Sequence, residues 1–152
     1  MKHRHLSLIL IFLLLSLTLM FAQAEQNPVT DDAKYQEMAY NIFDMLYDKD
    51  MKVVADIDWN VLIVDYDTLG VKYAKLTTDS ERMEFQTKVI GDLSYWLQIY
   101  EDEGDYYEWS FSQSEDGTWY LYGITEFFDV YLDFAAKDGK LKLINVSFED
   151  FY

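Results

Sequence analysis

The chain has 152 residues, of which 28 are acidic, 12 are basic and none is cysteine. Its formal net charge of −16 at pH 7 repels phosphate backbones and anionic lipid surfaces, so neither nucleic acid nor a membrane is an expected partner. Without cysteine no disulfide can support the fold, and its stability must come from packing.

The first 24 residues have the pattern of a secretory signal peptide. The basic start MKHRH precedes the apolar run LSLILIFLLLSLTLMF, and the small residues of AQA follow it. This order predicts cleavage after Ala24 and a secreted or periplasmic protein. The alternative is an uncleaved anchor helix, because the run approaches membrane-spanning length. Residues 25–152 have a length suited to one domain with a single core.

Histidine occurs only within the predicted signal, at His3 and His5. After cleavage the domain would lack both His and Cys, which are the main protein ligands of zinc, copper and haem. No metal site and no cofactor are therefore predicted. Any chemistry would depend on Asp, Glu, Tyr, Lys, Ser or Thr.

Two amphipathic helices are predicted in the first part of the domain. Over residues 32–47 apolar side chains recur at three- and four-residue steps, which is the helical period. The longer helix begins near Ser80, where Thr78 and Glu81 have the spacing of a capping box. It ends near Gly104, because glycine commonly follows the last helical residue.

The segment between these helices is ambiguous. Residues 51–57 fit a short helix, whereas residues 59–69 fit either a strand or another helical piece, because short apolar runs occur in both. Gly70 is expected to end the element that Trp59 begins.

The rest of the domain is predicted to be antiparallel sheet. The Asp-Gly pairs at 116–117 and 138–139 each lie between alternating runs, which is typical of a two-residue hairpin turn of type I′. The first turn would place Phe111 opposite Tyr122, and a slip of one residue would exchange the two faces. The predicted fold class is α+β, with helices packed on a curved antiparallel sheet.

The second hairpin would pair Phe134 with Leu143 and Asp133 with Ile144. Asp133 stands among apolar neighbours and has two interpretations. A buried carboxylate would have a raised pKa and could act as an acid or base. The more ordinary interpretation is an aspartate at the solvent edge of the sheet.

In the predicted register of the first hairpin, most aromatic side chains share one face. Plain core is the simplest interpretation of these rings. Several carry polar tips, however, which a dry core does not need, and this favours a half-open ligand cavity between the sheet and the long helix. The side chains expected to line it are Tyr107, Trp109, Tyr120, Tyr122, Glu126 and Asp133, of which Glu126 and Asp133 are also weak catalytic candidates.

Three segments carry a resemblance to a known superfamily: YQEMAYNIFDMLYDKD, SERMEFQTKVIGDLSYWLQ and the closing DGKLKLINVSFED. Their order resembles the nuclear-transport-factor-2-like (SnoaL-like) proteins, which have a cone-shaped α+β fold. The resemblance implies a pocket at the open end of the cone and often a homodimer formed through the sheet. Members range from isomerases and dehydratases to non-catalytic binding modules. The absence of histidine from residues 25–152 excludes the His–Asp arrangement of the dehydratases.

The predicted function is that of an exported, small, acidic binding or accessory module. Its aromatic-lined pocket would take a small apolar or aromatic ligand. One alternative is a small cofactor-free isomerase or dehydratase that uses Asp or Glu together with Tyr, which a buried carboxylate beside a tyrosine hydroxyl would favour. Another is a carbohydrate-binding surface module, which would need exposed coplanar rings.

Overall fold

The structure is a computed structural model, which describes residues 31–103, 108–124 and 128–150. The chain divides into two units, residues 1–34 and residues 35–152. Of the first unit, only the beginning of one helix belongs to the described residues. The second unit contains the sheet and its core.

Both long helices predicted from the sequence are confirmed. Helix α2 spans Asp31–Tyr47 and helix α4 spans Asp79–Glu103. The capping box before α4 is formed as expected: the Thr78 N–H donates to Glu81 Oε2 at 2.9 Å, and the Glu81 N–H donates to Thr78 Oγ1 at 3.2 Å. Two backbone N–H groups at the helix start are thereby satisfied.

The ambiguous segment between these helices forms four short elements. A 3₁₀ helix, η1, covers Met51–Asp56 and confirms the predicted short helix. The strands β1 (Ile63–Val64) and β2 (Asp67–Thr68) follow, and the one-and-a-half-turn helix α3 (Leu69–Tyr73) comes next. The segment is therefore strand in one part and helix in another, which a single periodicity could not indicate.

The expectation that Gly70 ends this segment is wrong, because Gly70 lies within α3. A Cβ atom at this position would lie 2.3 Å from the carbonyl oxygen of Asn60. The Gly70 N–H also donates to the Leu62 carbonyl at 2.9 Å. Glycine is thus needed here for a close approach of two backbones and does not act as a helix stop.

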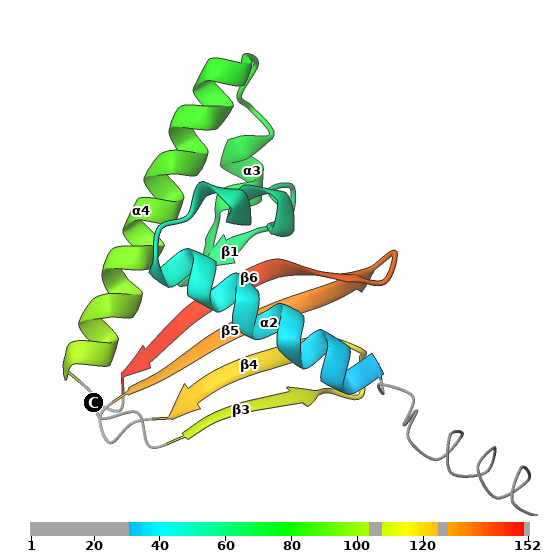
Figure 1. The fold of residues 1–152 in the computed structure, drawn as a ribbon. Coiled ribbons are helices and arrows are strands. Elements are labelled where there is room, and N and C mark those ends of the chain that lie inside the picture. Colours follow the sequence, from blue (N-terminus) through cyan, green and yellow to red (C-terminus); the bar gives the residue numbers. More distant parts are fainter. Residues whose placement is uncertain (1–30, 104–107, 125–127, 151–152) are drawn as a thin grey trace, which may run out of the picture. The chain divides into compact units, whose positions relative to one another are not determined.

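The sheet has six strands in the order β2-β1-β6-β5-β4-β3 (Figure 1). Its four long strands are β3 (Glu108–Gln113), β4 (Trp119–Ile124), β5 (Phe128–Lys137) and β6 (Lys140–Asp150). These four pair antiparallel, as predicted, whereas the short strand β1, which lies between β2 and β6, pairs parallel to β6. The α+β class is confirmed, with a mixed sheet in place of a purely antiparallel one.

The turn of the second hairpin is confirmed. Asp138 and Gly139 have φ values of 52° and 72°, so both central residues lie in the left-handed region that a type I′ turn requires. Lys137 and Lys140 flank the turn as partners. A two-residue turn of this type matches the right-handed twist of the strands that it joins.

A bulge in β6 changes the pairing farther from that turn. Phe134 lies opposite Leu143, as predicted, but Asp133 lies opposite Asn145. Ile144 is the extra residue, so the predicted pairing of Asp133 with Ile144 is wrong. Bulges insert one unpaired residue and shift the register beyond them.

The turn of the first hairpin differs from the predicted type. Only Gly117 has a positive φ, of 88°. Its N–H donates to the Ser114 carbonyl at 3.1 Å, and the Ser114 N–H donates to the Thr118 carbonyl at 2.9 Å. The Asp116 carboxylate accepts the Thr118 N–H at 3.0 Å. This is a three-residue loop in which a left-handed glycine closes a tight turn.

The longer loop shifts the first hairpin by one residue, so the predicted register is wrong. Phe111 lies opposite Leu121, and Tyr122 lies opposite Ser110. The observed register gathers Phe111, Leu121 and Trp119 on the helix side of the sheet. It leaves the polar-tipped Tyr122 on the other side, which is the energetically better division of these side chains.

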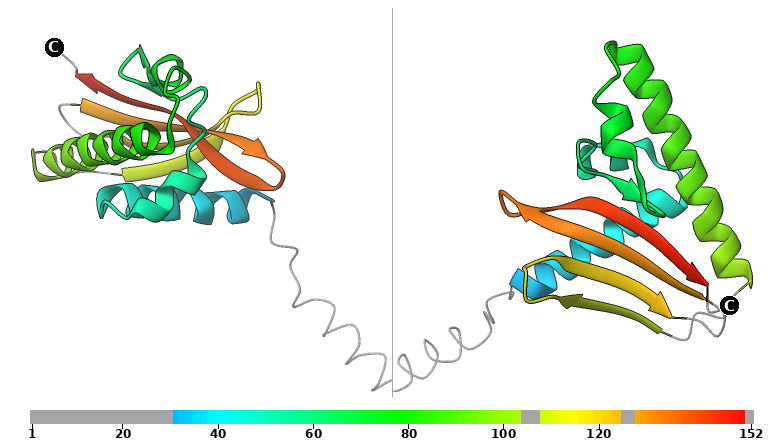
Figure 2. Two further views of the ribbon diagram at one scale, coloured as in Figure 1. Left: turned by 90° about the horizontal axis from the view of Figure 1, so that it is seen from above. Right: turned by 180° about the vertical axis from the view of Figure 1, so that it is seen from behind.

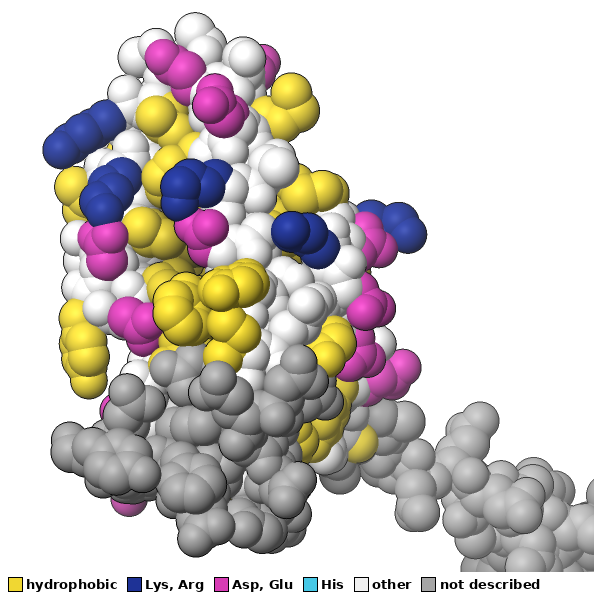
Figure 3. All heavy atoms as spheres, turned by 90° about the vertical axis from the view of Figure 1, so that its left-hand side faces the viewer, with side chains coloured by type: hydrophobic (Ala, Val, Ile, Leu, Met, Phe, Trp, Pro, Cys, Tyr) yellow, Lys and Arg dark blue, Asp and Glu magenta, His cyan; other side chains and the backbone are white. Residues whose placement is uncertain are grey.

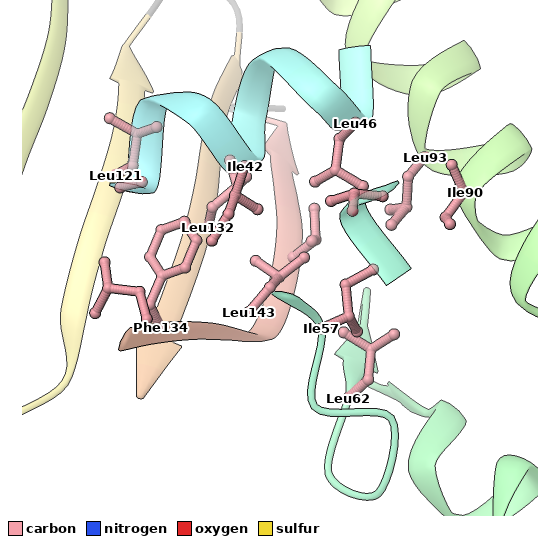
Figure 4. Packing of buried hydrophobic residues seen from close by; sticks show 14 of the residues in the cluster. Ile42, Leu46, Ile57, Leu62, Ile90, Leu93, Leu121, Leu132, Phe134 and Leu143 are labelled. Carbon is pink, nitrogen blue, oxygen red and sulfur yellow. The ribbon is translucent and has the colours of Figure 1, made fainter. Parts of the chain in front are cut away.

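The core lies between the sheet and the helices α2 and α4 (Figure 4). At the edge of the core, the ring centroids of Phe43 and Trp109 lie 4.6 Å apart. The Phe111 ring stacks on the Trp119 ring, with centroids 5.1 Å apart. These rings belong to the core, in agreement with the simpler interpretation of the aromatic side chains given above. The buried hydrophobic residues that α2, α4 and the four long strands contribute are Ala39, Ile42, Leu46, Val89, Ile90, Leu93, Leu97, Trp119, Leu121, Val130, Leu132, Phe134, Leu141, Leu143 and Val146.

Within the described ranges, no helix combines the length and the apolar character needed to cross a membrane.

Candidate functional site

The face of the sheet turned away from α2, called here the outer face, carries the candidate site (Figure 2, right). Because side chains alternate along a strand, the neighbours of the buried Leu132 and Phe134 point to this face. Tyr131 and Asp133 therefore lie there on β5, with Tyr120 beside Asp133 on β4.

A hollow of about 740 Å³ lies against the outer face. This volume falls within the range of small-molecule sites in proteins. Its walls come from the long strands, from the turn of the first hairpin and from the region of β1 and β2. The described residues that line it are Val61, Ile63, Tyr66, Asp116, Thr118, Tyr120, Tyr131, Asp133, Ile144, Asn145, Ser147 and Glu149.

Asp133 is half-buried in the hollow. Strand β5 lies between β4 and β6, so the interpretation of Asp133 as an edge residue is wrong. The Asn145 side-chain amide donates to Asp133 Oδ2 at 2.9 Å. Burial raises the pKa of the Asp133 carboxyl above its ordinary value, the hydrogen bond from Asn145 opposes that rise, and the charge of Asp116 adds to it.

Tyr131 is held at the wall of the hollow by two contacts. Its hydroxyl donates to Asp129 Oδ2 at 3.0 Å, and its ring stacks on Tyr122 at 6.1 Å between centroids. Burial, the hydrogen bond to Asp129 and nearby negative charges raise the pKa of the Tyr131 hydroxyl to about 12. Tyr131 therefore stays protonated at neutral pH and acts as a hydrogen-bond donor.

The turn between β1 and β2 forms part of the rim. Asp65 and Tyr66 have φ values of 44° and 67°, in the left-handed region. Asp65 is anchored there, because its N–H donates to the Val146 carbonyl at 3.0 Å and its carboxylate accepts the Phe148 N–H at 2.9 Å. The Tyr66 ring is 84% exposed and lines the hollow.

The hollow is acidic. Three of its described lining residues, Asp116, Asp133 and Glu149, are carboxylates, and none is Lys or Arg. Lys142, on the same strand as Asn145, is held elsewhere by Asp56 at 3.6 Å and by the Ala55 carbonyl. In the part of the chain that the structure describes, no three Asp, Glu, His or Cys side chains gather as metal ligands.

The structure brings together part of the predicted site. Tyr120 and Asp133 line the hollow side by side, and Tyr122 lies on the same face. Sequence reasoning missed Tyr131 and Asn145. The two-residue period along β5 places Tyr131 on the face of Asp133 and could have found it, whereas the position of Asn145 depends on the bulge.

The remaining predicted residues do not join this group. Trp109 lies opposite Gly123, on the helix side, where it packs on Phe43. The predicted cavity between the sheet and the long helix required Trp109 to share a face with Tyr120, so these rings do not form it. Tyr107 and Glu126 lie outside the described residues.

A second hollow, of about 360 Å³, lies beside α4. Figure 3 shows this side of the molecule, with hydrophobic side chains among lysines and carboxylates. Of the charged groups of this hollow, Lys72 pairs with Asp67 and Lys88 with Asp92, while the Asp65 carboxylate accepts the Phe148 N–H. Because these lysines already have carboxylate partners, this hollow offers no argument for a charged ligand. Its apolar lining residues are Val64, Leu69, Phe85, Val89, Leu93 and Trp96.

Comparison with protein-family models, with curated proteins and with solved structures gave no match for this chain. The resemblance to the nuclear-transport-factor-2-like superfamily therefore stays a prediction from the order of the elements. What the protein does has to be argued from the hollow itself.

Proposed function

We propose that the protein is an exported, acidic binding module that holds a small ligand with an apolar or aromatic body in the hollow of the outer face. The observation that carries the proposal is the combination of a concave surface of about 740 Å³ with one half-buried, hydrogen-bonded carboxylate, Asp133. A concave, mostly apolar wall with a few fixed polar groups is the usual design of a ligand site.

The walls suit a ligand of this kind. Tyr120 and Tyr131 offer ring surface from the sheet, while Val61, Ile63 and Ile144 offer aliphatic surface. Tyrosine gives a large contact area with little loss of conformational freedom. The Tyr131 hydroxyl donates to Asp129, which holds its ring in place at the wall. The hollow is concave, which supports a small molecule more than a flat sugar-binding platform.

An enzymatic role has one observation in its favour. Asp133, whose pKa is raised, lies directly opposite Tyr120 on the neighbouring strand. A carboxylate beside a phenol is a suitable pair for moving a proton within a bound substrate. Conversion of a bound molecule by the wild type, and binding without conversion by Asp133→Asn, would support the enzyme over the binding module.

Membership of the nuclear-transport-factor-2-like superfamily is part of the same proposal, together with a homodimer through the sheet. Two copies that met through the outer face would cover the hollow of each, so that association and ligand binding would compete, and would bring Asp133 and Glu149 of each near those of the other. Association should therefore strengthen as salt screens the repulsion. Sedimentation velocity at about 0.01 M and about 1 M salt measures this, and association that weakens with salt would contradict a dimer through this face.

Native mass spectrometry of protein from an exporting host tests the binding function. We expect an N-terminus at Glu25 and a co-purified small molecule. Ser147→Trp would fill the hollow and should remove that molecule, whereas the matched control Ser80→Trp, exposed at the start of α4, should keep it. Where nothing co-purifies, Nile red, a neutral aromatic dye, is the probe. Equal binding by both variants would contradict the proposal.

A further inference from the structure

We propose that the ligand of this hollow is a small organic cation, an amine with an aromatic or aliphatic body, whose ammonium group binds Asp133. This inference rests on the proposed function and specifies the class of ligand.

The charge of the hollow is the first observation. Its three carboxylates have no basic side chain among the described lining residues. The segments after residue 24 that the structure leaves undescribed contain no Lys or Arg, so they add no basic side chain that could neutralise these carboxylates. An anionic ligand would meet uncompensated repulsion here, whereas a cation would relieve it.

A cross-strand pair beside the hollow adds to this imbalance. Asp129 lies directly opposite Glu149, which lines the hollow. Like charges in such positions destabilise a sheet. Asp129 is only 6% exposed, and among the described residues no group donates to its Oδ1 atom. Around the hollow, carboxylates therefore outnumber basic side chains among the described residues.

The geometry of Asp133 suits it to receive an ammonium group. Asn145 holds one carboxylate oxygen, Oδ2, at 2.9 Å, and this fixes the orientation of the group. Among the described residues no donor reaches the other oxygen, so it remains available as an acceptor. A hydrogen bond between an ammonium and a carboxylate is stronger than one between neutral groups, and partial burial strengthens it further.

The aromatic side chains that line the hollow also favour a cationic ligand. The rings of Tyr120 and Tyr131 flank Asp133 in the hollow, and an aromatic face attracts a nearby cation. At the rim, Tyr66 keeps an 84% exposed ring on a left-handed backbone, with φ of 67°. A tyrosine is strained in that region, and strain of this kind is commonly kept for function.

A metal ion fits these observations less well than an organic cation. The described residues contain no group of three acidic side chains placed to hold a metal. The walls of the hollow are instead rings and aliphatic side chains, which a bare ion would not use. An amine uses both features, since its charge binds Asp133 and its body covers the walls.

Isothermal titration calorimetry at pH 7 with three probes of similar size tests the inference. The probes are 2-phenylethylamine, 2-phenylethanol and 3-phenylpropanoate, which are cationic, neutral and anionic. We expect the amine to bind about tenfold more tightly than the alcohol, with the propanoate weakest. Asp133→Asn should remove that advantage, so that the amine and the alcohol bind with similar affinity. The matched control Asp48→Asn, exposed and outside the hollow, should behave as the wild type.

The outcomes separate the two proposals. If the alcohol binds as tightly as the amine, or the propanoate binds more tightly, the cation inference is overturned while the binding function stands. If Asp133→Asn keeps the preference for the amine, the role of Asp133 is overturned. If none of the probes binds, the cation inference and the binding function both fail.

Tyr66→Gly provides a second variant, at an exposed residue outside the core, and it should weaken binding of the amine about threefold.

Discussion

The charge of Asp133 destabilises the folded protein, and its proposed role in ligand binding explains why the residue is present. Its carboxyl has a raised pKa in the folded protein, so the folded state binds a proton more readily than the unfolded chain does. The stability contributed by this group is therefore complete below the ordinary value of 3.8 and is lost as the pH rises through the raised value.

The change Asp133→Asn should accordingly raise the melting temperature at pH 7, because it removes a charge that burial disfavours. The gain should shrink as the pH is lowered towards the ordinary carboxyl pKa, where Asp133 is neutral in both states. Thermal unfolding of both proteins between about pH 3 and pH 7 measures the difference. A variant that is less stable than the wild type at pH 7 would show that the carboxylate supports the fold.

Tyr66 offers a second test of a residue kept for function. Replacement by glycine relieves the left-handed backbone and should increase the free energy of unfolding by about 1 kcal/mol. The matched control is Asp65→Gly, which relieves similar strain but loses the hydrogen bond from the Phe148 N–H. Urea unfolding should show a gain for Tyr66→Gly only. A loss of stability on Tyr66→Gly would assign the ring a structural role.

At the scale of elements, the register of the first hairpin decides which rings are core. Leu121 is fully buried, whereas Tyr122 is half-buried on the outer face. Leu121→Ala should therefore cost about 2–5 kcal/mol of unfolding free energy, and Tyr122→Ala distinctly less. Chemical denaturation of the two variants measures this. The register expected from a two-residue turn would reverse the order, so a larger loss for Tyr122→Ala would contradict the observed pairing.

The helices could be predicted because their signals are local. The three- and four-residue period of α2 and the capping box at Thr78 are read within one segment of the chain. The short strands β1 and β2 could not be predicted, since two residues each are too few for an alternating pattern. Their position is set by the pairing of β1 with β6, about eighty residues away in the chain.

The two Asp-Gly turns show how far a local signal extends. At Asp138 the dipeptide gives the expected turn, whereas at Asp116 the side chain accepts the Thr118 N–H and a longer loop forms. Loop length fixes the register of a hairpin. One more loop residue than predicted therefore exchanged the two faces of β3 relative to β4. For this reason the sequence indicated Tyr120 and Asp133 as site residues but assigned them to the wrong side of the sheet. The contact with Asn145 required a bulge that has no clear sequence signal.

At the scale of the whole molecule, part of the net charge of −16 is concentrated at the hollow of the outer face. A strongly acidic surface keeps a protein soluble, and most such charge needs no ligand. The hollow differs because its carboxylates stand among rings, with no Lys or Arg among its described lining residues. By contrast, both lysines of the hollow beside α4 are paired with carboxylates.

The measurement that tests this account most directly is a titration of the ¹⁵N-labelled protein with 2-phenylethylamine, followed by amide chemical shifts. The account predicts that the largest shift changes occur at Tyr120, Asp133 and Asn145, on the outer face. The amides of Leu93 and Trp96, on α4 at the second hollow, should stay unchanged. Changes confined to Leu93 and Trp96, or no changes at any concentration reached, would contradict the claim that the outer face is the ligand site.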